Sequence, residues 1–131
     1  MKKAVLYILV FVLILSSCKK DGSGSRSVRY EFTSNISANY KMQYATDNNS
    51  HLIETFTGTT WTKSVSMIKQ EGIGNVNVAR LTVYPPAAWA NAATSAKIMI
   101  KIFVNNEQKI ATDTVLNASN IDAGIFSIIS F

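Results

Sequence analysis

The sequence has few of the residues that carry most catalytic and metal chemistry. Its 131 residues include one cysteine and one histidine, and only 16% of them are charged. A single cysteine excludes an internal disulfide framework and a cysteine-rich zinc site. A single histidine leaves little to build a Ser-His-Asp or Cys-His catalytic centre. We therefore expect a protein that is not an enzyme and that holds no metal and no cofactor.

Apolar residues, in contrast, are plentiful. Hydrophobic residues make up 47% of the chain, which is too much apolar surface for a disordered protein with so little charge. A length of 131 residues supplies one core and leaves no room for a second folded domain. The composition therefore predicts one ordered domain.

The few polar candidates for a site have ordinary explanations. His51 stands next to an Asn/Ser-rich turn, so we expect an exposed strand or turn residue and not a general base. Asp47 is followed by Asn48 and Asn49, and such side chains usually bond to their own backbone in a turn instead of holding calcium.

The chain opens with the pattern of a signal peptide. Lys2 and Lys3 precede an uncharged, apolar run over residues 4–15. This run is long enough for the apolar region of a signal peptide, but it is well short of the roughly 20 residues that a membrane-spanning helix needs. The pattern therefore predicts a cleaved leader.

The end of this run resembles the lipobox of bacterial lipoproteins. Leu15, Ser16 and Ser17 precede Cys18, the only cysteine of the chain. In the lipobox a signal peptidase cleaves before a cysteine that carries diacylglycerol. The resemblance implies that residues 1–17 are a lipoprotein signal peptide, and that Cys18 anchors the mature chain to a membrane.

The segment after the cysteine is polar and rich in Gly and Ser, so residues 18–27 are expected to be the lipidated cysteine and a flexible tether. Loss of Lys2 and Lys3 with the leader leaves 11 basic and 8 acidic residues, a net charge of +3. Apart from Lys19 and Lys20, the basic residues of the mature chain are scattered singly and form no stripe, which argues against nucleic-acid binding. We expect a location in the cell envelope, anchored to the outer membrane, on either its periplasmic or its surface-exposed side.

The remainder, residues 28–131, shows the two-residue period of half-buried strands. We expect an all-β domain, an antiparallel β-sandwich of about seven to eight strands, with aromatic residues such as Tyr30 and Trp61 in its core. Turn residues at 47–50, 58–59, 71–75 and 105–106 favour hairpins. The expected strands are 28–33, 40–45, 51–57, 60–69, 76–84, 96–104, 107–116 and 124–131.

The best candidate for a contact patch is the Pro- and Ala-rich segment at 85–93. Its two prolines end a strand, and the alanines favour one or two helical turns in a crossover between sheets. Trp89 lies here without periodic apolar neighbours, so it either plugs the open end of the sandwich or projects as a contact. Together with Tyr84, Pro85 and Pro86 it forms the predicted binding patch.

Several segments resemble small membrane-anchored proteins of the MmpS-like type and similar lipoproteins of Bacteroidota. The resemblance rests on residues 28–32 (VRYEF), 40–47 and 61–65 (WTKSV). It implies an Ig-like or MmpS-like sandwich. The leading hypothesis is a lipid-anchored envelope protein that acts as a non-catalytic binding or accessory module. The alternatives are an accessory subunit of an envelope transporter and a surface glycan-binding module.

Overall fold

The computed structural model describes residues 24–69 and 76–131. Within these ranges the chain is almost entirely strand and contains no α-helix, which confirms the predicted all-β class. Two short 3-10 helices, η1 (Ala87–Trp89) and η2 (Ala118–Asn120), interrupt the strands. The strands are β1 (Ser25–Asp47), β2 (Ser50–Ile68), β3 (Val78–Tyr84), β4 (Ser95–Val104), β5 (Glu107–Asn117) and β6 (Ile125–Ser130).

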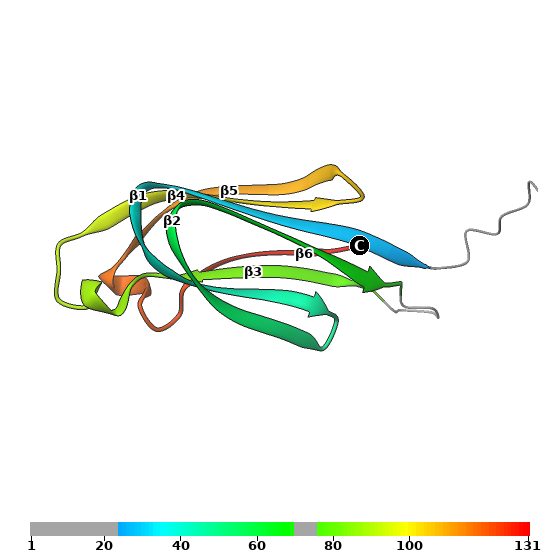
Figure 1. The fold of residues 1–131 in the computed structure, drawn as a ribbon, viewed down its shortest axis with the longest axis horizontal. Helices are drawn as coiled ribbons and strands as arrows, with labels where there is room; N and C mark the ends of the chain where they lie inside the picture. The colour runs from blue at the N-terminus through cyan, green and yellow to red at the C-terminus, as the bar shows by residue number, and fades with distance from the viewer. Residues whose placement is uncertain (1–23, 70–75) are drawn as a thin grey trace, which may run out of the picture.

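All six strands belong to one antiparallel sheet that folds back on itself (Figure 1). The sheet can fold because β1 takes part in both of its halves. Residues 28–34 of β1 pair with β4, whereas residues 41–44 pair with β3. We call the half with β4 and β5 the first layer, and the half with β3 and β6 the second layer. The strand β2 follows β1 through both layers.

The expected number of about eight strands is wrong, because two pairs of expected strands are continuous. The hairpin expected at residues 58–59 is a bend in the middle of β2. At the bend the pairing of β1 with β2 shifts between Thr33 and Ala38, opposite Gly58. Gly58 has a φ of 149°, which a residue with a side chain rarely adopts. The bend turns the chain from one layer into the other without a loop.

The start of the folded domain also differs from the expectation. The strand β1 begins at Ser25, so the last three residues of the expected tether are strand. Ser25 pairs with Ile68 and Ser27 pairs with Ser66. Backbone pairing needs no apolar side chain, so the polar sequence concealed this extension. Residues 18–23 of the expected tether and the turn expected at 71–75 lie outside the described residues.

The core lies between the two layers and is made by alternate residues of every long strand. The aromatic residues expected there are buried, which confirms that prediction. The Asn105–Asn106 turn between β4 and β5 has positive φ at both residues, as a two-residue hairpin requires. The buried apolar residues are Val28, Tyr30, Phe32, Tyr40, Met42, Tyr44, Trp61, Met67, Ala79, Leu81, Val83, Trp89, Ala96, Ile98, Ile100, Ile102, Val104 and Leu116.

The outer strands β5 and β6, one from each layer, come together along one side of the molecule. There the hydroxyl of Ser127 donates to that of Thr112 at 2.8 Å. On the other side β2 passes continuously from one layer to the other. The folded sheet is therefore nearly closed around its core.

Candidate functional site

Trp89 lies inside the molecule. Only 8% of the residue is exposed, and its ring meets that of Tyr40 edge-on, with the centroids 6.1 Å apart. The residue ends η1, in the crossover from β3 to β4, as the prolines and alanines predicted. Of the two alternatives for Trp89, the structure shows the first: the side chain plugs the open end of the sandwich. The expectation that it projects as a contact is wrong. The physical reason is that η1 folds back over the open end of the core, where Tyr40 offers an aromatic partner.

The other three residues of the predicted patch line a hollow of about 400 Å³ on the outside of the second layer. Tyr84, Pro85 and Pro86 form it with Lys41 and Asp122, among others. The crossover from β3 to β4, which contributes Pro85 and Pro86 to this hollow, lies at the end of the molecule opposite to the start of β1 (Figure 1).

The tyrosine of this hollow is fixed by its neighbours. The Tyr84 hydroxyl donates to the Gln43 side-chain oxygen at 2.9 Å. The ammonium group of Lys41 lies over the ring, 4.2 Å from its centroid. A cation therefore occupies one face of this aromatic ring.

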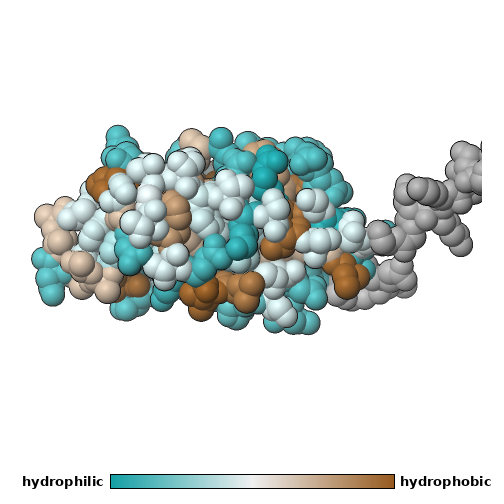
Figure 2. Space-filling model, in the orientation of Figure 1, coloured by the Kyte–Doolittle hydropathy of each residue, from teal (hydrophilic) through white to brown (hydrophobic). Residues whose placement is uncertain are grey.

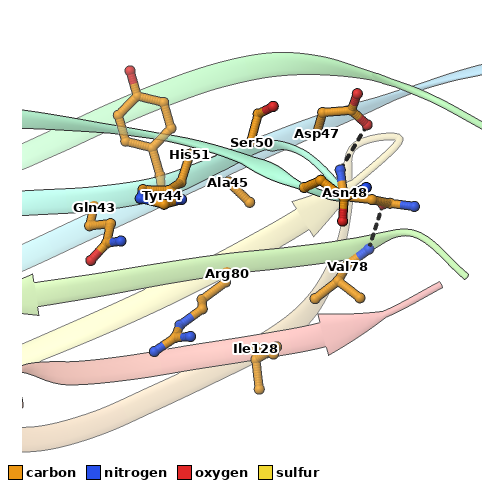
Figure 3. Close-up of a pocket in the computed structure, with 11 residues that line it drawn as sticks. Gln43, Tyr44, Ala45, Asp47, Asn48, Ser50, His51, Val78, Arg80 and Ile128 are labelled. Atoms are coloured by element: carbon orange, nitrogen blue, oxygen red, sulfur yellow. Dashed lines mark hydrogen bonds between the residues drawn. The ribbon is translucent and has the colours of Figure 1, made fainter.

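A second hollow, of about 300 Å³, lies beside the turn between β1 and β2 (Figure 3). Here β1 and β3 separate, since their pairing ends at Tyr44 and Leu81. The side chain of Asn48 bridges the gap: its oxygen accepts from the N–H of Val78 at 3.2 Å, and its amide donates to the carbonyl of Val76 at 3.2 Å. Figure 3 shows Asn48 between the turn and the start of β3.

The buried phenol of Tyr30 lies on the core side of the place where β1 and β3 separate. Tyr30, on the first layer, is fully buried, and its hydroxyl donates to the Ala45 carbonyl at 2.8 Å. Burial raises the pKa of the Tyr30 phenol far above its ordinary value. Tyr30 is therefore a neutral phenol whose hydrogen bond joins the two halves of β1, beneath the second hollow.

Between the two hollows lies a surface that we call the cationic face. Its residues point outward from the second layer. Those on β1, β3 and β6 alternate with residues that face the core, and Ile53 of β2 pairs with Gln43 across the strands. The Arg80 guanidinium lies 4.9 Å from the centroid of the Phe126 ring, and its Nε donates to the Thr82 hydroxyl at 3.2 Å. The cationic face comprises Lys41, Gln43, Ile53, Arg80, Thr82, Tyr84, Phe126 and Ile128.

This face combines positive charge with exposed apolar side chains. Ile53, Phe126 and Ile128 are 56%, 53% and 45% exposed. None of the eight residues is acidic. The carboxylates of Asp47 and Asp122 line the hollows at its two ends, and that of Asp47 accepts from the backbone N–H of Asn48. Figure 2 shows apolar residues in separate patches among polar ones in the view of Figure 1.

The outer face of the first layer has a different charge pattern. Its Arg29 forms an ion pair with Glu31 at 2.9 Å and also lies 4.1 Å from the centroid of the Phe103 ring. Glu31 pairs with Lys101 across the strands. Cations and carboxylates are therefore mixed on this face, whereas none of the eight residues of the cationic face is acidic and the carboxylates of Asp47 and Asp122 lie in the hollows at its ends.

A further polar group lies at the inner side of the bend in β2. The Glu54 carboxylate accepts from the Trp61 indole at 2.7 Å, the Lys63 ammonium at 2.9 Å and the Tyr44 hydroxyl at 3.2 Å. The hydrogen bond from Lys63 is the largest of the effects that lower the pKa of Glu54, and it raises the pKa of Lys63 in turn. The carboxylate thus ties the two halves of β2 together.

Other expectations from the sequence have mixed outcomes. His51 is exposed at the start of β2, as expected. Within residues 24–69 and 76–131, no three His, Cys, Asp or Glu side chains are grouped so that they could hold a metal ion. No helix in the same ranges is long and apolar enough to cross a membrane. Leu15, Ser16, Ser17 and Cys18 lie outside the described residues.

No protein-family model matches the sequence, and no curated protein is significantly similar to it. The residues described above are therefore the basis for any functional proposal.

The cationic face was not recognised from the sequence. Lys41 and Gln43 alternate with buried residues, and so do Arg80 and Thr82, which signals outward positions. The pattern does not say that β1, β3 and β6 are neighbours, and this neighbourhood is what brings Lys41 and Arg80 onto one surface.

Proposed function

We propose that the protein is a lipid-anchored component of a bacterial cell envelope that acts as a non-catalytic binding or accessory module. The observation that carries the proposal is the position of Cys18. It is the only cysteine of the chain, it ends an apolar leader-like run, and it lies seven residues before the first residue of β1. A folded domain close behind a single cysteine is the arrangement of a tethered lipoprotein.

The layout of the sandwich supports the same proposal. The strand β1 begins at one end of the long axis, and the crossover from β3 to β4, which borders the hollow formed by Tyr84, Pro85 and Pro86, lies at the other end (Figure 1). Seven residues of flexible chain have a root-mean-square span of roughly 15 Å. An anchor at Cys18 would hold the first end near the membrane and leave the far hollow and the sides of the sandwich open to partners.

The test of lipidation is metabolic labelling with an alkyne-bearing fatty acid in a bacterial host. We expect the wild-type protein to take up the label and Cys18→Ala to remain unlabelled. An inhibitor of lipoprotein signal peptidase should leave the precursor uncleaved. A wild-type protein that matures without label would contradict the proposal.

The side of the membrane is tested with a protease or an impermeant label on intact and lysed cells. Reaction in intact cells would favour a partner outside the cell, such as a surface glycan or protein. Protection until lysis would favour a periplasmic accessory role.

A further inference from the structure

We propose that the cationic face is the docking surface for an acidic segment of a protein partner. The inference rests on the proposed binding function and adds the chemical class of the partner. It starts from the placement of Lys41 and Arg80 beside exposed apolar side chains on one outer face, with no carboxylate among the eight residues of that face.

The two cations are held in place before any partner arrives. Lys41 rests over Tyr84, and that ring is held in turn by Gln43. Arg80 rests over Phe126 and bonds to Thr82, which is fully buried. Side chains fixed in this way lose less conformational freedom on binding than free lysines and arginines do. Carboxylates are the complementary groups, and guanidinium binds them with two parallel hydrogen bonds.

The apolar residues favour a protein segment over other anionic partners. Ile53 lies at one side of the face, and Phe126 and Ile128 lie at the other, each about half exposed. A peptide carries apolar side chains that can cover them, whereas a glycan covers apolar surface mainly by stacking its sugar rings on free aromatic rings. Here both aromatic rings of the face already lie against a cation.

The charge of the chain also argues against a second copy as the occupant. After loss of the leader its net charge is +3, from 11 basic and 8 acidic residues. Pairing two cationic faces would place like charges opposite each other, which is unfavourable.

The first experiment measures binding of fluorescent poly-L-glutamate to the membrane-extracted full-length protein in a non-ionic detergent at low salt. We expect the double variant Lys41→Gln/Arg80→Gln to bind about tenfold more weakly. The matched control is Lys97→Gln/Lys101→Gln on β4, which removes two cations from the other layer and should change affinity less than about twofold.

A second variant tests whether weaker binding reflects the charge of the face and not misfolding of the double variant. Ile128→Glu adds a carboxylate at an exposed position, leaves both cations in place, and should also weaken binding about tenfold through repulsion. Equal losses in the β4 control and the face variants, or no binding by the wild-type protein, would overturn the proposal.

Polygalacturonate and vesicles of phosphatidylglycerol serve as competing probes. Binding of either that is tighter than that of poly-L-glutamate and sensitive to the same variants would overturn the choice of a protein partner. Lipidation is read separately by the fatty-acid label. In one outcome the protein takes up no fatty-acid label while the variants of its cationic face still bind poly-L-glutamate more weakly than the wild type. That result would refute the lipid anchor and support the docking surface.

Discussion

Glu54 is the clearest case of a single residue that links the two halves of a strand. Its carboxylate accepts three hydrogen bonds, from Tyr44, Trp61 and Lys63. Tyr44 belongs to the core, Trp61 lies at the rim of the core, and Lys63 lies on the solvent-exposed side. The group is therefore placed where the bend in β2 would otherwise expose the core to water.

Replacing this carboxylate should lower stability at neutral pH. We expect Glu54→Gln to reduce the free energy of unfolding by about 1 kcal/mol at pH 7, because a partly exposed group loses its charge-assisted hydrogen bonds. Urea denaturation followed by tryptophan fluorescence measures the change. The matched control is Glu31→Gln, which breaks one ion pair on the outer face and should cost less than about 0.5 kcal/mol.

The same group predicts a pH dependence. The pKa of Glu54 is lowered in the folded state from an ordinary value of 4.5. Its contribution is therefore complete above that ordinary value and is lost as the pH falls through the lower, folded-state pKa. The stabilities of wild type and Glu54→Gln should converge under acid. A difference that stays constant from pH 7 to pH 2 would show that the charge of Glu54 is not responsible.

At the scale of single residues the sequence predicted burial well. Tyr30, Tyr44 and Trp61 alternate with polar residues, and period-two alternation is a direct reading of which face is buried. Trp89 could not be placed in this way, because a residue outside a strand has no alternating neighbours to reveal its direction. Only the path of η1 over Tyr40 decides its burial.

The bend shared by β1 and β2 is the element that sets the architecture. Its pivot is Gly58, where a Cβ atom would come within 2.7 Å of the Phe56 ring. The sequence predicted a hairpin turn at this glycine. The chain does change direction at Gly58, but it bends within β2 instead of reversing. Two alternating runs separated by a glycine look alike whether the chain reverses or bends, because the difference lies in pairing with β1.

A side chain at this pivot should be poorly tolerated. We expect Gly58→Ala to lower the free energy of unfolding by about 1–3 kcal/mol, since it adds backbone strain and a contact that Phe56 must relieve. The neighbouring change Thr59→Ala, at an exposed position, should stay within about 0.5 kcal/mol. The measurement is the urea midpoint at constant slope. Equal effects of the two substitutions would mean that the bend does not depend on glycine.

For the whole molecule, the sharing of strands predicts that the two layers unfold together. Both β1 and β2 contribute to each layer, so neither layer can keep its hydrogen bonds when the other is lost. The sequence could indicate a sandwich but not this sharing, because pairings between distant segments leave no local pattern. The cationic face escaped prediction for the same reason.

Removal of the end plug tests this cooperativity. Trp89→Ala should lower the free energy of unfolding by about 3–5 kcal/mol, the usual cost of removing a large buried aromatic side chain. Trp61, which remains as a reporter, and far-ultraviolet circular dichroism should show one coincident transition at a lower midpoint. A loss below about 1 kcal/mol would contradict the role of Trp89 as a buried plug, and two separate transitions would contradict the shared-strand interpretation.

The position of β1 has a mechanical consequence. Its first half lies between β2 and β4 and is hydrogen-bonded to both. A pull at Gly24 along the strand would load the pairs with β2 from Ser25 on, and from Val28 on the pairs with β4 as well. A domain held at this end would therefore resist tension by shearing two hydrogen-bonded ladders along residues 28–33, instead of opening one ladder bond by bond.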